Sequence, residues 1–503
     1  MGRRIENAGI GGAASFPYNH GLMTTRATPG QTRPLCVDLD GSLLATDLLH
    51  ESLLSTLQRS PWLILACVVW AARGRAHLKN QLALRARLDV TSLPYREEVI
   101  AFLGEERSRG RPIVLATASS ALLARQVADH LKIFDEVIAS TDELNLKGRR
   151  KAAELTRRFG AGGFDYLGDS ASDLPVWQAA ERAHIVDRSG RLAQRVRRRA
   201  KVDRVFATGS ATTRLTAMLG ALRPHQWVKN LLVFVPLVAA HRLHDASLLA
   251  AAAVAFAAFC ALASSAYLFN DLLDLGSDRA HPRKRQRPLA SGRLSVLAGG
   301  AMSLLALAAG AALASALPMA FRLSLAAYFG LTLAYSLGLK KVPILDIVSL
   351  AGLYTLRIIG GGYAVSAPVS AWLLAFAVFL FFSLAMVKRY AELVSFAADG
   401  VASLPGRGYV VADTNLVLTA GASSAMMSVL VLALYTNGDS VAALYSNPDA
   451  LWLLCPILLY WILRIWLLAA RGRMHDDPVL FAVRDPVSYL AAASGALVLW
   501  MAT

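Results

Sequence analysis

The chain has 503 residues, a hydrophobic content of 55% and a formal net charge of +17. Its mean hydropathy of +0.44 is unusual for a soluble protein, so we expect a membrane protein. The positive charge lies mainly in the N-terminal half and in a few short loops, without a basic groove interleaved with aromatic residues. This pattern favours an anionic membrane surface over nucleic acid as the partner of the charge.

The N-terminus and the cysteines indicate the compartment. Residues 1–33 lack an apolar core of signal-peptide length, so we expect a disordered N-terminus and a first domain that stays cytoplasmic. The cysteines lack the paired spacing of metal ligands, so we interpret them as buried thiols in a reducing compartment or within the bilayer. They are Cys36, Cys67, Cys260 and Cys455.

Residues 34–187 are predicted to form a soluble α/β domain. Short apolar runs alternate with helical stretches, which is the pattern of a parallel β-sheet. These runs are PLCVDLD, PIVLATAS, FDEVIAS, FDYLGDS and AHIVD. The reactive side chains of the domain fall at the ends of these runs, where α/β proteins bind their ligands.

The first two runs supply groups for phosphoryl chemistry. In VDLDGS, Asp38 can attack phosphorus and Asp40 can protonate the leaving oxygen. Thr117, at the end of VLATAS, is suited to hold a phosphate oxygen.

The later segments supply cations and metal ligands. NLKGRRKAAEL offers Lys147 and Lys151, and YLGDSASD places Asp169 and Asp173 at a strand end. Carboxylates in that position suit Mg²⁺.

These pieces resemble the haloacid dehalogenase superfamily of phosphatases over about 150 residues. The resemblance implies that Asp38 is the nucleophile, that Asp40 is the acid and base, and that Thr117 binds phosphate. It also implies that Asp169 is a metal ligand and that Asp173 helps to position the metal.

Some details of the resemblance stay open. Asp38 and Asp40 are expected to contribute to the metal site, and Lys151 is the expected motif lysine with Lys147 as its competitor. Ser42 stands where the family usually has threonine and keeps a hydroxyl group there. The helical segment between the first two runs would be a cap. Its run PWLILACVVWAA is too short to cross a bilayer, so it is either a cap core or a helix that dips into the membrane surface.

After the first domain the chain becomes basic and then strongly apolar. Residues 188–221 include RSGRLAQRVRRRAKVDR and are predicted to be a basic linker at the membrane surface. Residues 222–503 are predicted to form an all-α membrane domain of about nine spans. The spans are expected to start near residues 227, 247, 296, 320, 343, 370, 414, 449 and 487.

Loop charges predict the topology of these spans. Alternate loops are basic, and the intervening loops are neutral, acidic or nearly so. By the positive-inside rule, the basic loops are cytoplasmic, so nine spans place the C-terminus outside. The expected location is therefore the cell (inner) membrane, with the N-terminal domain in the cytoplasm.

The segment Asn270–Gly292 combines acidic and basic clusters at the end of an apolar run. A continuing helix would place Asn270, Asp271, Asp274 and Asp278 within one narrow wedge. Hard oxygen ligands in such a wedge suit Mg²⁺, with Asn270, Asp274 and Asp278 as the candidate ligands. The basic residues that follow supply donors for phosphates.

The spelling NDxxDxxxD resembles the UbiA superfamily of membrane prenyltransferases. The nearer resemblance is to its decaprenyl-phosphate phosphoribosyltransferase branch, which serves cell-wall arabinan synthesis. It rests on RPHQWVKN, DRAHPRKRQRPLASG, YSLGLKKVPILD and VKRYAEL. Most members carry a second aspartate pair, but here Asp346 stands alone, with Val342 before it and Lys340 and Lys341 nearby.

In that branch the donor is 5-phosphoribosyl diphosphate and the acceptor is a polyprenyl phosphate. The resemblance implies that the acceptor phosphate attacks the anomeric carbon while Mg²⁺ neutralises the leaving diphosphate. Asp271 and Asp274 are the candidate catalytic residues. Other residues in the membrane domain are candidates for binding substrate and phosphate, with no individual assignment: Lys229, Asn230, Arg285, Arg287, Tyr335, Lys340, Asp346, Arg357, Lys388, Arg389 and Glu392. Arg357 could instead pair with Asp346, and Glu392 could be an ordinary salt-bridge partner.

Together these patterns predict a bifunctional enzyme. The membrane half would make polyprenylphosphoryl-5-phosphoribose, and the soluble half would remove its ribose 5-phosphate. Its partners would be these two substrates, the membrane and, as a further possibility, other copies of the chain. One alternative is an aromatic prenyltransferase for quinone-like lipids, which the missing aspartate pair disfavours. Another is that the soluble domain only binds or regulates. A transport ATPase is disfavoured because VDLDGS precedes every span.

Overall fold

The computed structural model describes residues 32–141, 145–209, 211–398, 407–438, 441, 444–474 and 477–503. All but two residues of the expected disordered N-terminus, 1–33, lie outside this part of the chain. The contacts divide the chain into two units. The first, here called the α/β unit, comprises Met1–Leu44, Cys67–Leu84 and Tyr95–Thr208, and the second, the helical unit, comprises Ala45–Ala66, Arg85–Pro94 and Gly209–Thr503.

A six-stranded parallel sheet forms the centre of the α/β unit, with the strand order β3-β2-β1-β4-β5-β6. The strands are β1 (Leu35–Val37), β2 (Ile113–Ser120), β3 (Glu136–Ser140), β4 (Asp165–Gly168), β5 (Ala183–Asp187) and β6 (Val202–Ala207). The predicted parallel sheet is thus confirmed, and each predicted run contains a strand. Strands β2 and β3 lie on one side of β1, and β4, β5 and β6 lie on the other, so the strand order reverses at β1. Ligands are expected at the carboxyl end of β1, where this reversal occurs.

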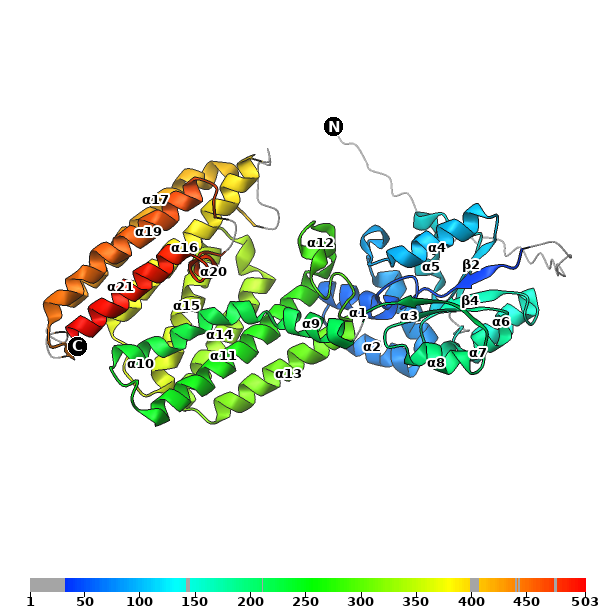
Figure 1. The fold of residues 1–503 in the computed structure, drawn as a ribbon, viewed down its shortest axis with the longest axis horizontal. Coiled ribbons are helices and arrows are strands. Elements are labelled where there is room, and N and C mark those ends of the chain that lie inside the picture. The colour runs from blue at the N-terminus through cyan, green and yellow to red at the C-terminus, as the bar shows by residue number, and fades with distance from the viewer. Residues whose placement is uncertain are drawn as a thin grey trace, which may run out of the picture. The chain divides into compact units, whose positions relative to one another are not determined.

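Helices cover both faces of this sheet (Figure 1). The helices are α3 (Arg75–Arg85), α4 (Glu97–Ser108), α5 (Ala121–Leu131), α6 (Arg149–Phe159), α7 (Leu174–Ala179) and α8 (Arg191–Arg197). Trp177 of α7 and Val196 of α8 are fully buried in the core on one face, beside Tyr166 of β4. Burial of large apolar side chains on the sheet stabilises this layer.

Ordered elements also occupy the range 188–221, for which the sequence predicted a basic linker. Helix α8 and strand β6 lie within it, and β6 pairs with β5 at the edge of the sheet. Ala193, Val196 and Phe206 are buried there, so a few apolar residues among many arginines are enough to add these elements. Helix α9 (Ala211–Leu222) follows.

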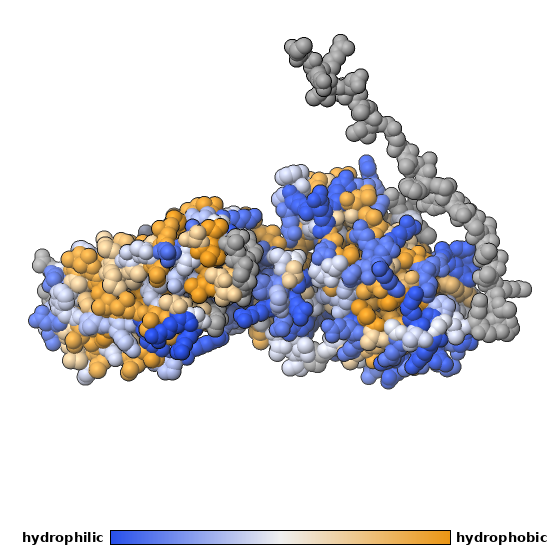
Figure 2. Space-filling model, turned by 90° about the horizontal axis from the view of Figure 1, so that it is seen from above, coloured by the Kyte–Doolittle hydropathy of each residue, from blue (hydrophilic) through white to orange (hydrophobic). Residues whose placement is uncertain are grey.

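Seven helical segments among the described residues are long and apolar enough to cross a membrane. They are α11 (Ala246–Leu273), α13 (Val296–Ser315), α14 (Met319–Leu337), α15 (Leu345–Ala364), α16 (Ala371–Ala398), Val411–Thr436, which contains α17 (Thr414–Thr436), and Pro448–Ala470, which contains α19 (Leu454–Ala470). The unit exposes broad hydrophobic areas, as expected for a surface that faces lipid (Figure 2). The chain is therefore an integral membrane protein.

Two of the nine expected spans, one at each end of the series, are not among these seven long helices. The segment expected to start near residue 227 consists of the 3-10 helix η3 (Pro224–Phe234) and the short helix α10 (Val235–Ala239). The last segment is α21 (Pro486–Ala502), an apolar helix shorter than the seven others. The backbone of η3 approaches α15 closely at Gly361. A Cβ atom at this position would lie 2.1 Å from the carbonyl oxygen of Val233, so the contact requires glycine.

Part of the segment expected to cap the first domain belongs instead to the helical unit. Helix α1 (Leu48–Arg59) and the 3-10 helix η1 (Val90–Ser92) lie in the ranges 45–66 and 85–94. The Gln58 side chain donates hydrogen bonds to the carbonyl oxygens of Leu272 and Leu273, at 2.9 and 3.0 Å. These carbonyls end α11 and would lack partners within the helix. Helix α1 therefore caps the C-terminus of α11.

The short apolar helix α2 (Leu63–Ala72) is largely exposed. Trp62 just before it, Leu65 and Val68 are 70%, 73% and 66% exposed. Of the two interpretations open from the sequence, these exposures disfavour a cap core.

Candidate active sites

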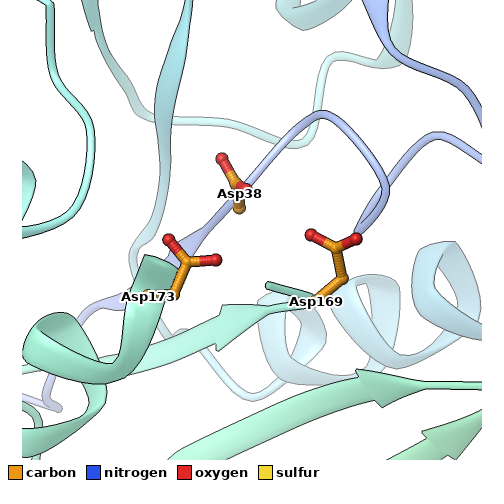
Figure 3. A group of neighbouring side chains, drawn as sticks. All are labelled: Asp38, Asp169 and Asp173. Atoms are coloured by element: carbon orange, nitrogen blue, oxygen red, sulfur yellow. The ribbon is translucent and has the colours of Figure 1, made fainter. Parts of the chain in front are cut away.

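Two neighbouring strands bring acidic side chains of the α/β unit together. Asp38 follows β1, Asp169 follows β4, and Asp173 lies in the 3-10 helix η2 (Ala171–Asp173). Their ligand oxygens all lie within 4.8 Å of one another, and Figure 3 shows the three carboxylates around a common space. Within the described ranges, no other three acidic, histidine or cysteine residues form such a group.

A buried lysine neutralises part of this charge. Lys151 in α6 donates a hydrogen bond to Asp38 Oδ1 at 2.8 Å, and its Nζ lies 3.7 Å from Asp173 Oδ1. Burial alone would lower the pKa of Lys151, but the carboxylates of Asp38 and Asp173 raise it, so the amine stays charged. The competing Lys147 is exposed. The structure therefore brings Lys151, the expected motif lysine, to the acidic group.

The three carboxylates fit a divalent cation. Burial, and then the charges of Asp38 and Asp173, raise the pKa of Asp169 to about 7, so negative charge is in excess here. Asp173 Oδ2 is buried without a hydrogen-bond partner among the described residues. Gly41 has a φ of +77°, and a Cβ atom there would lie 2.1 Å from Asp169 Oδ2. A glycine at this position therefore leaves room for the carboxylate, and the donor set suits Mg²⁺.

Hydroxyl groups connect the remaining residues of this site. Thr117 is fully buried, and its Oγ1 accepts a hydrogen bond from the Ser119 amide at 3.0 Å. The Ser119 hydroxyl donates to Asp40, and the Ser42 hydroxyl donates to Asp169 at 3.3 Å. Ser119 was not among the predicted site residues, although it stands in the same VLATAS segment as Thr117.

In the helical unit, the acidic wedge divides into two groups because the helix does not continue through it. Helix α11 ends at Leu273, Asp274 caps it, and α12 (Leu275–Ala280) begins immediately. Arg287 then bridges two of the carboxylates, with Nη1 3.0 Å from Asp271 Oδ1 and 2.5 Å from Asp278 Oδ2.

Both groups contain basic partners. Arg223, from the segment before η3, donates to Asp271 at 2.5 Å. Asp274 accepts from the Asn270 amide at 2.9 Å, and Lys340 lies 3.2 Å from the same carboxylate. Arg285 is exposed. The side chains have the oxygen ligands expected for Mg²⁺, but each carboxylate here is neutralised by a lysine or an arginine.

A third group centres on Asp477, which the sequence analysis missed. Lys229 of η3 donates to Asp477 at 2.9 Å, Lys388 of α16 donates to it at 3.4 Å, and the Tyr354 hydroxyl donates at 3.4 Å. Burial alone would raise the pKa of Asp477, but Lys388 and Lys229 hold it well below its usual range. The acidic pair in RMHDDP, after a basic loop, was the available signal.

Arg357 pairs with a neutral network and not with Asp346, which corrects one of the options left open by the sequence. Its guanidinium donates to Asn230 Oδ1 at 2.7 Å and to the Tyr328 hydroxyl at 2.9 Å. It also lies 4.6 Å from the centre of the Tyr328 ring, a cation–π contact. A buried charge with several such contacts rigidifies the junction of η3, α14 and α15.

Asp346 is instead paired with Arg389, and both side chains are fully buried. Arg389 donates to Asp346 at 2.6 Å and also donates to Glu392, and the Tyr409 hydroxyl donates to Asp346 at 2.7 Å. Arg389 and Glu392 are thus brought together as the helical spacing suggested.

Arg407 closes this group and is a second residue that the sequence analysis missed. It donates to the Tyr335 hydroxyl at 3.1 Å and lies 3.8 Å from the carboxylates of both Asp346 and Glu392. Its side chain is 25% exposed, so it can meet a ligand that the fully buried Arg389 cannot reach.

The chain therefore has a candidate site in the α/β unit and another in the helical unit. Comparison with known proteins shows which class of protein combines them. The chain matches the UbiA prenyltransferase family over residues 231–485 and haloacid dehalogenase-like hydrolases over residues 35–178. It belongs to the UbiA prenyltransferase family and carries an N-terminal haloacid dehalogenase-like domain, which confirms both resemblances.

Three relatives refine this placement. The uncharacterized protein y4nM of Sinorhizobium fredii is 38% identical over 461 residues, which cover 92% of this chain and 89% of the relative. Nodulation protein NoeC of Azorhizobium caulinodans is 38% identical over 55% of this chain and 90% of its own length. Decaprenyl-phosphate phosphoribosyltransferase of Mycolicibacterium smegmatis is 38% identical over 36% of this chain and 58% of that protein.

Proposed function

We propose that the helical unit transfers 5-phosphoribose from 5-phosphoribosyl diphosphate to a polyprenyl phosphate, and that the haloacid dehalogenase-like domain then removes the ribose 5-phosphate. The product would be a precursor of cell-wall arabinan. The phosphoribosyltransferase relative supports the choice of donor and acceptor. The fusion of a phosphatase-like domain to this transferase supports the second step, because the transfer product retains one phosphomonoester.

The burial and pairing of Asp346 are the observation that favours two phosphate-bearing substrates over a prenyl diphosphate. Two separate metal-bound carboxylate motifs would suit a prenyl diphosphate, but Asp346 is fully buried against Arg389 and has no second aspartate four residues before it. Arg287 and Lys340 lie against carboxylates near the end of α11, and Lys229 and Lys388 lie against Asp477. This arrangement supports two substrates that each bring phosphate, because phosphates would be bound largely by arginine and lysine.

The proposed transfer joins an oxygen of the lipid phosphate to C1 of the ribose and breaks the bond from C1 to the diphosphate. Lys340, Arg287 and Arg223 would bind the diphosphate as its charge develops, and Lys229 and Lys388 would bind the other phosphates. Mg²⁺, for which Asn270, Asp274 and Asp278 offer oxygen ligands, would neutralise the leaving group. The basic partners of these carboxylates in this structure would turn to the substrate phosphates.

In the proposed phosphatase step, Asp38 attacks the phosphorus and Asp40 protonates the ribose oxygen that leaves. Lys151 holds Asp38 at 2.8 Å and keeps its orientation toward the phosphate. Mg²⁺ held by Asp38, Asp169 and Asp173 would balance the charge of the phosphate, and Thr117 would bind a phosphate oxygen. Water then releases phosphate from Asp38.

The test follows labelled ribose in membranes supplied with 5-phosphoribosyl diphosphate, polyprenyl phosphate and Mg²⁺. Wild type is expected to give dephosphorylated lipid, Asp274→Asn none, and Asp38→Asn a lipid with one additional phosphate. Asp245→Asn and Asp203→Asn are matched controls outside both sites. Absence of labelled lipid with correctly inserted wild type refutes the transferase. A prenylated aromatic acceptor in a parallel assay would favour the aromatic alternative.

The loop charges support a cytoplasmic N-terminal domain and an extracytoplasmic C-terminus in the inner membrane. For the basic loops to alternate across the membrane, the segment 224–239, which consists of η3 and α10, must cross the bilayer. An 11-residue η3 and a five-residue α10 would span about 30 Å at the usual rise of these helices, which matches the hydrocarbon core. A C-terminal fusion to a reporter that is active only outside the cytoplasm tests this topology.

A further inference from the structure

A cavity of about 480 Å³ lies against the acidic group of the α/β unit. One wall contains Gly41 and Asp169, which border the proposed metal site. The lining also includes Arg188, in the turn between β5 and α8, and Arg191 and Arg195, in α8. The cavity thus extends from the proposed phosphatase chemistry to a cluster of three arginines. Its volume is in the range of sites for small ligands.

The charge of these arginines is not balanced locally. Arg188, Arg191 and Arg195 form no ion pair with any acidic residue in the described ranges. Asp187, the other acidic residue of the cavity wall, uses its two carboxylate oxygens for the backbone amides of Ser189 and Ala193, at 2.9 and 2.8 Å. Asp187 therefore shapes the turn that carries Arg188 and the first turn of α8, and it does not pair with the arginines.

A fourth guanidinium adds to the same positive field. Arg96 donates a hydrogen bond to the Gly41 carbonyl at 3.1 Å, directly beside the acidic group. Burial, and then the charge of Arg188, lower the pKa of Arg96 to about 10. The three arginines of the cavity wall are exposed, so a ligand can reach them. Planar guanidinium groups match phosphate oxygens in two-point contacts, so a cluster of them suits a phosphate.

We propose that this cavity binds a second anionic group of the phosphatase substrate. The phosphomonoester that is cleaved would lie at Asp38 and Asp169, and a phosphate elsewhere on the same molecule would contact Arg188, Arg191 and Arg195. The substrate class is therefore a sugar phosphate that carries a further phosphate. The inference rests on the proposed phosphatase function and narrows its substrate. The proposed transfer product has this character, because it retains both a sugar monophosphate and a phosphodiester.

The experiment measures kcat/KM for release of phosphate by full-length protein in neutral detergent. Two probes are compared, ribose 1,5-bisphosphate and ribose 5-phosphate, which differ in the second phosphate. The variant Arg188→Gln/Arg191→Gln/Arg195→Gln is compared with Arg197→Gln, an exposed arginine of α8 outside the cavity wall. The ratio of kcat/KM for ribose 1,5-bisphosphate to kcat/KM for ribose 5-phosphate is expected to fall at least roughly tenfold in the triple variant. The reason is that the charged hydrogen bonds from the arginines to the second phosphate are lost. The matched control should keep the wild-type ratio.

Binding provides a readout that does not need turnover. In the Asp38→Asn background, titration calorimetry of ribose 1,5-bisphosphate should show weaker binding for the triple variant than for Arg197→Gln. The helical unit is identical in both proteins, so phosphate sites there cancel from the comparison.

Three results would overturn the subsite. One is an unchanged kcat/KM ratio with unchanged binding in the triple variant. Another is an equal loss for both probes. A third is a fall of kcat/KM in the triple variant that is absent in detergent and appears only when the protein is in vesicles of phosphatidylglycerol. That result would make the arginines a contact for the membrane surface. Failure of folded wild type to release phosphate from either probe would instead refute the proposed phosphatase, while the calorimetry would still decide the subsite.

Discussion

Removal of one partner from the buried Glu51–Arg279 pair is expected to loosen helix α1. The two residues are 228 positions apart, and their side chains are 3% and 5% exposed. Both carboxylate oxygens of Glu51 accept from Arg279, at 2.6 and 3.0 Å, and the Thr46 hydroxyl donates to one of them at 2.6 Å. In Glu51→Gln the shape of the side chain is kept, but Arg279 loses its only negatively charged partner among the described side chains.

The magnitude follows from the burial of this pair. Breaking a buried ion pair by removing one partner costs about 3–5 kcal/mol, because the other charge stays desolvated. At about 1.4 kcal/mol per factor of ten, the lower bound raises the opening constant of α1 roughly a hundredfold. Pairs near the surface contribute only about 0.3–0.5 kcal/mol each. Glu154 pairs with Arg157 and Arg158, so Glu154→Gln should change the opening of α6 by less than about sixfold.

Hydrogen–deuterium exchange of the α1 amides in the detergent-solubilised protein measures this effect. Glu51→Gln is expected to accelerate exchange in α1, and Glu51→Gln/Arg279→Gln to recover part of the loss because no buried charge is left unpaired. Transferase activity should fall with α1, since Arg279 follows Asp278 and Gln58 caps the end of α11 beside Asp274. Slow, unchanged exchange in Glu51→Gln, or strictly additive effects in the double variant, would refute the reasoning.

Three further predictions concern other buried groups. Lys151→Met should lower phosphatase kcat at least about a hundredfold with transferase output retained, and equal loss of both activities would contradict a local role. Asp477→Asn should weaken the hold on Lys229 and Lys388 and raise the KM for 5-phosphoribosyl diphosphate several-fold, which substrate titration measures; an unchanged KM would exclude these lysines from the substrate site. Burial lowers the pKa of His184, so protonation is favoured in the unfolded chain and stability should fall as the pH drops below about 6.5. Exchange of the β5 amides at pH 7.5 and 5.5 checks this, and His184→Leu should lose part of the pH dependence.

The parts of the fold that the sequence could predict are those with a local signature. The apolar runs of the parallel sheet and the long apolar helices are visible residue by residue, and the positions of Asp38 and Asp169 at strand ends follow from them. The same holds for Lys151, four residues after Lys147, although its burial had to come from the structure. Motif resemblance then identified both families before any contact was known.

The parts that escaped prediction depend on contacts between distant segments. Strand β6 lies within an arginine-rich range, and only its pairing with β5 shows that a few apolar residues suffice there. Helix α1 looked like part of a cap, because nothing local to Glu51 indicates a partner in the helical unit. The acidic wedge failed for a different reason: the helical geometry assumed for it ends at Leu273, and Arg287 then draws Asp271 and Asp278 together.

The basic residues of the helical unit follow one pattern that links structure to the proposed chemistry. Arg287 and Lys340 each lie against carboxylates at the end of α11, and Lys229 and Lys388 share Asp477. A cation held between a carboxylate and a future phosphate needs little rearrangement when the substrate arrives, because the phosphate replaces one anionic partner with another. By contrast, the Asp346–Arg389 pair has no exposed side. It therefore fixes the positions of α15 and α16, and in the proposed transfer the partly exposed pairs would supply the contacts that change.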